Sequence, residues 1–447
     1  MVRAFYYQLL LIRVLKGLDR YSAPPSDDPP LTSLYDSLTT NLPHPIMGYT
    51  EYSFPPSTPL FPVAATVQAY IESYASHFNL TPLIRFNTSV TRAKWIHDHW
   101  GVTISTGEVL EFDHLVVANG HYRRPNVPDI PGLDHWITTK MAIHSAWYRR
   151  PHEFGPKVLV VGGGPSGRDI VTDMRNHGRM VIHSVSGSIP RDDDCFKLRG
   201  EPLHFYDDGR VVFENGTAEE NIDHCILATG FQMDFPFFDD DTIKIGDAPL
   251  HPSLPPDLYN SRRHVYPLAK FLFPLQSRYP ASSVAFMTLL FKVAPLPIAE
   301  AQARAIVRAF ADPASLDLNK EANNVLSRSR ALAAGGASTP LQLAKAWFRL
   351  TETEQWNYRD ELFAYAAESG DCPAIKVDTW EKEMYANKDI LRTAWVDLER
   401  KNESQGWARG VGEGGVQEWV EMMYRLLQYA RNCRDFSEPD SRKLEVD

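Results

Sequence analysis

The spacing of apolar residues along the chain predicts a mixed α/β protein. Over residues 62–78 apolar side chains recur at helical spacing, which indicates an amphipathic helix. Residues 83–118 are typical of strands and include the alternating stretches GVTIST and GEVLEFD. Residues 157–230 combine both patterns in one compact αβ unit, and helical patterns dominate from Pro297 onward, with a break at 331–339. We therefore expect an α/β fold followed by a C-terminal helical region.

A glycine-rich turn between a strand and a helix is the strongest local signal. The stretch VLVVGGGPSGRDIVTDM, residues 158–174, places G-x-G-x-x-G after an apolar β-branched run, and Gly178 follows as a helix C-cap. Such glycines allow a tight turn, the approach of a pyrophosphate, and close packing of helix on strand. A purely structural turn is the alternative. The candidate nucleotide-binding residues of this turn are Gly162, Gly164, Pro165, Ser166 and Gly167.

The end of the next strand favours NADPH as the nucleotide. An NAD site usually carries a carboxylate there, about 20 residues beyond the first glycine, to hold the ribose hydroxyls. This chain has His183-Ser184-Val185-Ser186 at that point, and Arg191 follows shortly after. We predict that Ser184 and Arg191 contact a 2′-phosphate; the alternative for both is a solvated loop residue.

Two other strands end in small residues and glycine, at VVANG (116–120) and LATG (227–230). Such ends let the backbone pass close to a flat or charged ligand. Because the two strands flank the glycine-rich unit, we interpret that unit as an insertion in a second nucleotide-binding domain. The candidate residues at these ends are Asn119, Gly120, Thr229 and Gly230.

Composition narrows the class of protein. The net charge of −10 comes without a basic block, which argues against binding to nucleic acid or to an anionic membrane surface. The four cysteines are far apart and form no CxxC pair, so we expect a reducing, cytoplasmic environment and no metal site. No apolar stretch is long enough to predict a membrane span. The acidic C-terminal helices are expected to pack on the core or to mediate dimer contacts.

Taken together, these motifs resemble the flavin-containing monooxygenases, and in particular their fungal branch. The resemblance runs from about Leu34 to at least Arg308. It is carried by SLYDSLTTNLPHPIMGY, FNTSV, FDHLVVANGHYRRPNVPDIPG, HSAWYRRP, DHCILATGF and VAFMTLLFKVAPLPIAEAQAR. It implies two Rossmann-like dinucleotide-binding domains, one holding FAD and an inserted one holding NADPH. By the same resemblance Asn41 is the active-site asparagine, Val90 lies in the strand that meets the flavin adenine, and His144 is a cofactor-side residue.

The resemblance also implies a reaction. NADPH reduces the flavin, dioxygen adds to form a C4a-hydroperoxyflavin, and one oxygen atom passes to a soft nitrogen or sulfur nucleophile. Such chemistry needs a dry cavity and neutral donors rather than a catalytic triad. Asn41 suits this role because an amide donates a hydrogen bond without releasing a proton. The alternative is that Asn41 only forms a turn before Leu-Pro.

Three positions depart from the family pattern F-x-G-x-x-x-H-x-x-x-Y/F and its late glycine. His144 and Tyr148 are in place, but Thr138 and Lys140 replace the phenylalanine and the first glycine. Tyr148 favours N- or S-oxygenation over Baeyer–Villiger chemistry. Thr288 stands where the family usually has glycine, and a Cβ there is expected to crowd the flavin.

The largest departure is at the N-terminus. The first hundred residues contain only Gly17 and Gly48, so we expect the phosphate turn of the FAD domain to be absent from this chain. The predicted divisions are an atypical N-terminus (1–31), an incomplete FAD domain in two parts (32–150 and 225–330), the NADPH domain (151–224) and the helical region (331–447). Three hypotheses follow: a monooxygenase whose sequence starts too late, a non-catalytic NADPH-binding relative, or a chain that does not fold.

Overall fold

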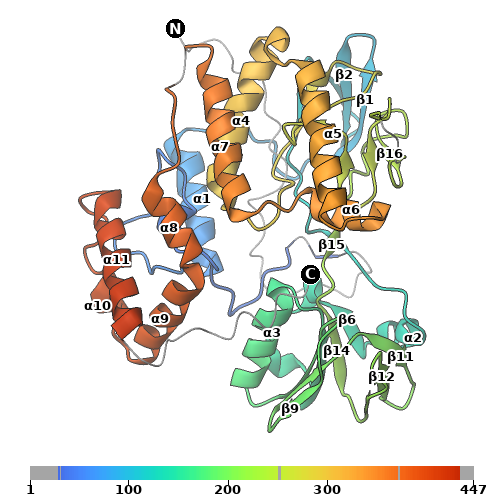
Figure 1. The fold of residues 1–447 in the computed structure, drawn as a ribbon, viewed down its shortest axis with the longest axis vertical. Helices are drawn as coiled ribbons and strands as arrows, with labels where there is room; N and C mark the ends of the chain where they lie inside the picture. Colours follow the sequence, from blue (N-terminus) through green and yellow to red (C-terminus); the bar gives the residue numbers. More distant parts are fainter. Residues whose placement is uncertain (1–28, 31, 250–252, 371–372, 433–447) are drawn as a thin grey trace. The chain divides into compact units, whose positions relative to one another are not determined.

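The computed structural model describes residues 29–30, 32–249, 253–370 and 373–432, and these form two compact units (Figure 1). One unit contains residues 40–120 and the described residues from 233 onward; the other contains residues 121–232 and the described residues before 40. The atypical N-terminus predicted over 1–31 lies almost wholly outside the described residues, as do Cys372 and Cys433. No helix in the described ranges has the length and apolar character needed to cross a membrane.

The smaller unit is built on a six-stranded sheet. In spatial order the strands are β6 (Ala142–His144), β14 (His224–Leu227), β7 (Lys157–Val161), β8 (Met180–Ser184), β10 (Phe196–Arg199) and β9 (Arg191–Asp193). The first five run parallel and β9 is antiparallel to β10. Helix α3 (Pro165–Asn176) connects β7 to β8, as the sequence predicts, and Gly178 follows it with φ +72°.

Alternation along β7 explains how both faces of this sheet are covered. Val158 and Val160 point to the face on which α3 packs, whereas Leu159 and Val161 point to the opposite face. The opposite face is covered by α2 (Leu133–Thr138) and by a small antiparallel sheet of β11 (Pro202–Phe205), β12 (Val211–Phe213) and β13 (Ala218–Glu219). A two-stranded ribbon, β5 (Arg124–Pro125) with β15 (Phe231–Gln232), completes the unit.

The larger unit contains several short sheets. The strands are β1 (Val90–Ile96), β2 (His99–Ile104), β3 (Val109–Phe112), β4 (Leu115–Val117), β16 (Lys244–Ile245), β17 (Tyr259–Asn260), β18 (Val265–Tyr266), β19 (Leu268–Ala269), β20 (Phe273–Pro274) and β21 (Val284–Phe286). Strands β1 to β3 form an antiparallel sheet, and β4 pairs with β21 in parallel. The prediction of strand from residue 83 was wrong for 83–89, because a short 3₁₀ turn at Thr81–Leu83 and left-handed backbone at Asn87 precede β1.

Helices make up most of the rest of the larger unit. They are α1 (Ala64–His77), α4 (Pro295–Ala311), α5 (Leu318–Ala334), α6 (Pro340–Trp347), α7 (Glu352–Ala367), α8 (Thr379–Ala386), α9 (Lys388–Arg400), α10 (Ser404–Ala408) and α11 (Val416–Asn432). Capping boxes at Thr339/Gln342 and Thr351/Glu354 start α6 and α7. The predicted break at 331–339 is confirmed, since α5 ends at Ala334 and α6 begins at Pro340.

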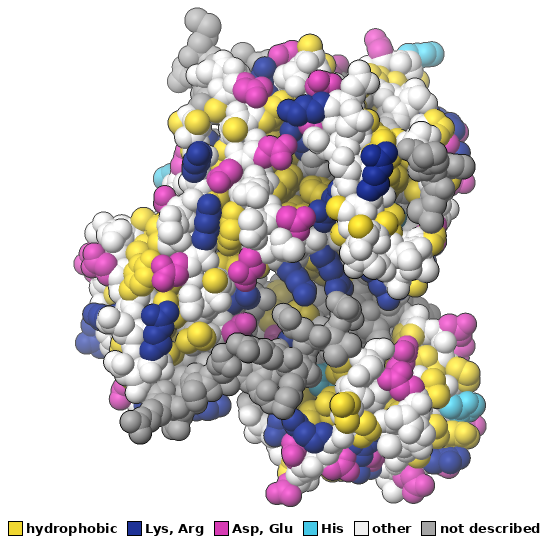
Figure 2. All heavy atoms as spheres, viewed as in Figure 1, with side chains coloured by type: hydrophobic (Ala, Val, Ile, Leu, Met, Phe, Trp, Pro, Cys, Tyr) yellow, Lys and Arg dark blue, Asp and Glu magenta, His cyan; other side chains and the backbone are white. Residues whose placement is uncertain are grey.

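Two apolar cores hold these helices. One joins the strands to α4–α7, and the other gathers α8–α11 around residues 42–61. Helices α4 and α7 lie side by side in Figure 1, as do α9 and α11. On the face drawn in Figure 2, acidic and basic side chains are interspersed across the helices of this unit.

Candidate functional site

The glycine-rich turn between β7 and α3 is built for close backbone contacts. Gly162 has φ +123°, and a Cβ there would stand 2.3 Å from the carbonyl oxygen of Ala228. A Cβ on Gly167 would stand 1.9 Å from the carbonyl oxygen of Gly162. Gly164 differs, because nothing lies within 4 Å of the Cβ it lacks. The first and third glycines therefore serve packing, and the middle one leaves an open approach to the N-terminus of α3.

That open approach suits an anion. Residues 163–166 are exposed, and the first turn of α3 contains no acidic side chain. The N–H groups of Ser166 and Gly167 belong to the first turn, where a helix leaves its donors without partners from the helix itself. The partial positive charge at a helix N-terminus favours phosphate. The turn therefore fits the pyrophosphate of a dinucleotide.

A histidine that sequence reasoning missed fixes the turn from the neighbouring strand. His183 on β8 is buried, and its Nε2 lies 3.0 Å from the carbonyl oxygen of Gly162. Burial lowers the pKa of His183, so the ring is neutral at physiological pH and Nε2 donates to that carbonyl. The signal in the sequence was a polar residue inside an otherwise apolar strand.

Ser184, a predicted contact of the 2′-phosphate, is buried in the sheet instead. Its hydroxyl donates to the carbonyl oxygen of Gly200 at 2.8 Å, and only 1% of the residue is exposed. The exposed polar groups lie just after the end of β8, in the loop 186–188. There the Gly187 N–H donates to the Glu214 carboxylate at 3.0 Å, and the Ser186 hydroxyl lies 3.4 Å from Glu201. Glu201 lies between β10 and β11, and Glu214 lies in the turn after β12, so spacing along the chain could not reveal these two carboxylates.

Arg191, the other predicted contact, remains available at the sheet edge. Its side chain is 63% exposed, packs over the ring of Phe196 and pairs with Asp193 at 3.3 Å. An exposed ion pair of this kind is weak, so the guanidinium can exchange Asp193 for a stronger anion.

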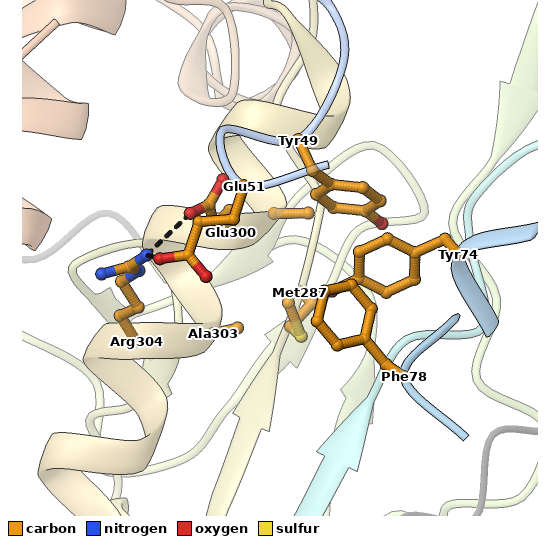
Figure 3. Close-up of a pocket in the computed structure, with 9 residues that line it drawn as sticks. Tyr49, Glu51, Tyr74, Phe78, Met287, Glu300, Ala303 and Arg304 are labelled. Carbon is orange, nitrogen blue, oxygen red and sulfur yellow. Dashed lines mark hydrogen bonds and ion pairs between the residues drawn. The ribbon is translucent and has the colours of Figure 1, made fainter. Parts of the chain in front are cut away.

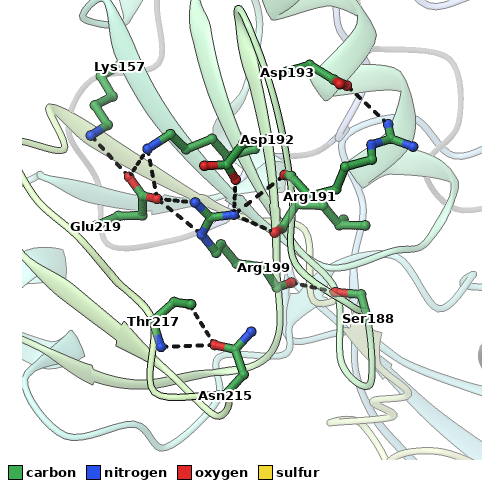
Figure 4. Close-up of polar contacts among 11 residues, drawn as sticks. Lys157, Ser188, Arg191, Asp192, Asp193, Arg199, Asn215, Thr217 and Glu219 are labelled. Atoms are coloured by element: carbon green, nitrogen blue, oxygen red, sulfur yellow. Dashed lines mark hydrogen bonds and ion pairs between the residues drawn. The ribbon is translucent and has the colours of Figure 1, made fainter.

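Beside Arg191 lies a buried ionic cluster centred on Glu219 (Figure 4). The carboxylate of Glu219 is 4% exposed and accepts hydrogen bonds from Arg199 and Lys197, while Lys157 lies 3.3 Å away. Burial raises the pKa of Glu219, but the hydrogen bonds from Lys197 and Arg199 outweigh burial and hold it below its usual value. Arg199 also bonds Asp192, so the cluster fixes β9, the strand that carries Arg191.

The end of β14 is held from two sides. His144 of β6 lies with its Nε2 2.9 Å from the carbonyl oxygen of Gly230, which has φ +81°. Asn126 lies on the other side: its backbone N–H bonds the same carbonyl, and its side-chain amide donates to the Thr229 carbonyl at 3.1 Å. His144 thus supports the strand end through its backbone. Asn126 was not singled out from the sequence, although it stands in the stretch FDHLVVANGHYRRPNVPDIPG that carries part of the family resemblance.

Tyr148 of the family pattern packs against α3. It is fully buried, and its hydroxyl donates to the carboxylate of Asp173 at 2.6 Å. The same carboxylate accepts a hydrogen bond from Ser37, and Tyr35 bonds Asp169 one turn earlier on the helix. Tyr148 therefore has a structural role within the smaller unit.

The larger unit carries the remaining candidates. Asn41 is exposed in a bend, and its amide makes no hydrogen bond to any other residue that the structure describes. Val90 opens β1 and is partly buried. Beyond β4, the side chain of Asn119 donates to the carbonyl of Asp234 at 3.0 Å, and Gly120 turns with φ +71° and open space where a Cβ would stand. The free amide of Asn41 and the open backbone at Gly120 are compatible with ligand contacts.

The model of the family described as "Flavin-binding monooxygenase-like" matches residues 14–189 and 197–330. The chain is 35% identical over 288 residues to flavin-containing monooxygenase FMO GS-OX5 of Arabidopsis thaliana, a match covering 57% of this chain and 61% of that protein. It is 29% identical over 407 residues to FMO GS-OX-like 2 of the same plant, covering 82% and 79%. The chain thus spans about three fifths of the first of these relatives.

The solved structures agree in fold. S-allyl-L-cysteine S-oxygenase from Allium sativum superposes with a TM-score of 0.65 at 25% identity, covering 91% of this chain and 84% of that one. Tmm from Pelagibacter sp. strain HTCC7211 gives a TM-score of 0.61 at 21% identity, covering 83% and 78%. These likenesses confirm the predicted α/β fold with Rossmann-like dinucleotide-binding domains. The prediction of a fungal branch finds no support, because these curated relatives are plant proteins.

Proposed function

The chain belongs to the flavin-binding monooxygenase-like family, and on that premise we propose that it is an FAD- and NADPH-dependent monooxygenase. The reaction places one oxygen atom of dioxygen on a soft sulfur or nitrogen nucleophile. The observation that carries the proposal is the turn at 162–167, with its open approach at Gly164 and the helix N-terminus behind it. FAD and NADPH are the cofactors of this family.

The residues of the smaller unit fit NADPH. Ser166 and Gly167 offer backbone N–H groups to the pyrophosphate, and His183 holds the turn in shape. Arg191 is the candidate contact of the 2′-phosphate, because the Ser184 hydroxyl already donates to the Gly200 carbonyl. A bidentate guanidinium–phosphate contact would replace its weak pair with Asp193.

The residues of the larger unit fit part of FAD. Gly120 presents open backbone at the end of β4, and Val90 stands at the start of β1. Among the described residues, the turn at 162–167 is the one G-x-G-x-x-G that joins a strand to a helix; the same spacing at 410–415 follows helix α10, so these contacts do not include a second phosphate turn of that kind. When bound, FAD supplies the redox chemistry that activates dioxygen. Asn41 would donate its amide to a polar group of the reacting centre, and a neutral amide does so without losing a proton.

Sulfur is the preferred oxygen acceptor in this proposal. Its support is the likeness to the S-oxygenase of Allium sativum, at 25% identity over 91% of this chain. A nitrogen nucleophile is the second candidate acceptor, and the organic substrate is a small molecule in either case. A homodimer remains a prediction.

The test is a visible absorption spectrum of the purified protein with and without added FAD, followed by turnover. We expect a bound-flavin spectrum, then NADPH-dependent conversion of an alkyl aryl sulfide to its sulfoxide, measured by mass spectrometry. A tertiary amine run in parallel separates sulfur from nitrogen acceptors. A folded protein that binds NADPH but no flavin, even with FAD in excess, would leave the non-catalytic NADPH-binding relative as the correct hypothesis.

A further inference from the structure

A cavity of about 340 Å³ lies within the larger unit, between α1, α4 and the loop that precedes α1 (Figure 3). Six of the side chains that line it decide its chemistry. They are Tyr49, Glu51, Tyr74, Phe78, Glu300 and Arg304. Figure 3 shows the three aromatic rings on one side and the two carboxylates with Arg304 on the other. The volume is in the range of small-molecule sites.

The aromatic side is preformed. The ring centroids of Tyr49 and Tyr74 are 4.4 Å apart, and those of Tyr74 and Phe78 are 4.6 Å apart. Tyr70 holds Tyr49 in place, because its hydroxyl accepts the Tyr49 N–H at 2.9 Å and its ring stacks on Phe54. The wall therefore exists without a ligand, and a ligand would not have to order it.

The charged side carries an excess of negative charge. Arg304 donates to Glu300 at 2.9 Å and to Glu51 at 3.3 Å, so two carboxylates share one guanidinium. The second oxygen of Glu300 accepts the Thr50 N–H, whereas Glu51 is 73% exposed at the rim. Burial is the main cause that raises the pKa of Tyr49 to about 12, and the nearby Glu300 carboxylate contributes to it. The same two causes, in the same order, also raise the pKa of Tyr74.

We propose that this cavity binds a small organic cation with a quaternary, methylated ammonium group. Ring faces attract such a cation, and clustered aromatic rings are the usual surroundings of quaternary ammonium ligands. The unbalanced carboxylate adds attraction and opposes the binding of anions. The bound nitrogen has no lone pair to accept oxygen, so this is a ligand site and goes beyond the proposed monooxygenation. It needs neither flavin nor NADPH.

The test uses the full chain without either cofactor and compares two probes of the same shape. Choline carries the positive charge, and 3,3-dimethylbutan-1-ol replaces its nitrogen by carbon. We expect saturable binding of choline by calorimetry, and binding of the neutral alcohol weaker by roughly tenfold or more. Equal binding of the two probes would mean that the cavity recognises apolar shape alone and would overturn the proposal. So would the absence of choline binding.

Two substitutions localise the site, each with a matched control elsewhere in the same unit. Phe78→Leu keeps apolar bulk but removes a ring face, and Phe86→Leu makes the same change at a similarly exposed residue outside the cavity. Glu51→Gln removes one charge at the rim, and Glu108→Gln does so at a surface ion pair with Arg85.

All four variants change exposed residues, so the fold should be kept, as circular dichroism can verify. We expect the two cavity variants to weaken choline binding several-fold and the two controls to leave it unchanged. Equal effects of cavity and control variants would overturn the proposal.

Discussion

The imidazole of His144 lies with its Nε2 2.9 Å from the carbonyl oxygen of Gly230, and so ties the end of one strand to the end of its neighbour. Its Nδ1 accepts the N–H of Ala146 at 3.1 Å, which assigns the proton to Nε2. Burial lowers the pKa of His144 to about 4, so this donor is neutral and present at physiological pH. His144 therefore positions the backbone of Gly230.

His144→Ala should lower the stability of the protein by about 1–3 kcal/mol, because it removes both hydrogen bonds and the packing of the ring against Phe231. Urea unfolding monitored by circular dichroism measures the loss. His135→Ala is the control, since His135 is half exposed in the same unit and its change should stay within about 0.5 kcal/mol. Similar losses in the two variants would contradict the positioning role.

Gly164→Ala and Gly167→Ala should separate nucleotide binding from folding. A Cβ at Gly164 meets no protein atom within 4 Å, so that variant should fold normally but weaken NADPH binding by crowding the approaching pyrophosphate. A Cβ at Gly167 would stand 1.9 Å from the Gly162 carbonyl, so that variant should be strongly destabilised. Thermal unfolding and fluorescence titration with NADPH measure the two effects. Unchanged NADPH binding by Gly164→Ala would argue against a phosphate at this turn.

Local patterns in the sequence predicted the parts of the fold that depend on local spacing. The strand–turn–helix around Gly162 is confirmed, and the helix predicted over 62–78 is observed at 64–77. Contacts between distant segments were not predictable in this way. His183 reaches back 21 residues to Gly162, and the turn after β12 brings Glu214 to the loop after Ser184. Neither contact has a spacing rule in the chain, because the first depends on which strands pair in the six-stranded sheet and the second on how the sheet that contains β12 packs beside it.

Arg191→Ala should distinguish the two nicotinamide cofactors. If its guanidinium holds the 2′-phosphate, its loss removes a charged hydrogen bond that NADH never makes. We expect NADPH affinity to fall by roughly tenfold and NADH affinity to stay unchanged, as measured by titration of each nucleotide. Arg210→Ala is a matched control, because Arg210 is also a partly exposed arginine of the same unit and pairs with Asp208. An equal loss for NADPH and NADH would place Arg191 outside the phosphate site.

Acid should destabilise the protein in the range between pH 6.5 and about 4. Burial lowers the pKa of His44 to about 3, and those of His121, His144 and His264 to about 4, below the ordinary value of 6.5. Below pH 6.5 the unfolded chain therefore binds protons that the folded chain does not bind. The contribution of these histidines to stability is thus complete above pH 6.5 and falls as the pH drops towards their pKa values in the folded state. Between pH 7 and pH 5 each such histidine should cost roughly 1–2 kcal/mol.

Urea unfolding midpoints at pH 7, 6 and 5 measure this acid effect. His144→Gln should show a shallower fall than the unchanged protein, because one of the contributing rings is gone. Midpoints that do not change over this range would mean that the buried rings accept protons in the folded state.

Thr288→Gly should stabilise the protein slightly. Thr288 has φ +57°, a left-handed conformation that costs a residue with a Cβ roughly 1–2 kcal/mol and is rare for β-branched side chains. Its N–H donates to the buried amide of Gln302 at 2.9 Å, which holds the backbone in that conformation. Glycine loses more conformational entropy on folding, which costs roughly 0.5–1 kcal/mol of stability. The net gain in stability should therefore be a few tenths to about 1 kcal/mol. Thr288→Val is the control, because it keeps the β-branch and loses only the hydroxyl, and its stability should not rise. A loss of stability in Thr288→Gly, with Thr288→Val unchanged, would show that the side chain at this position contributes more than its backbone conformation costs.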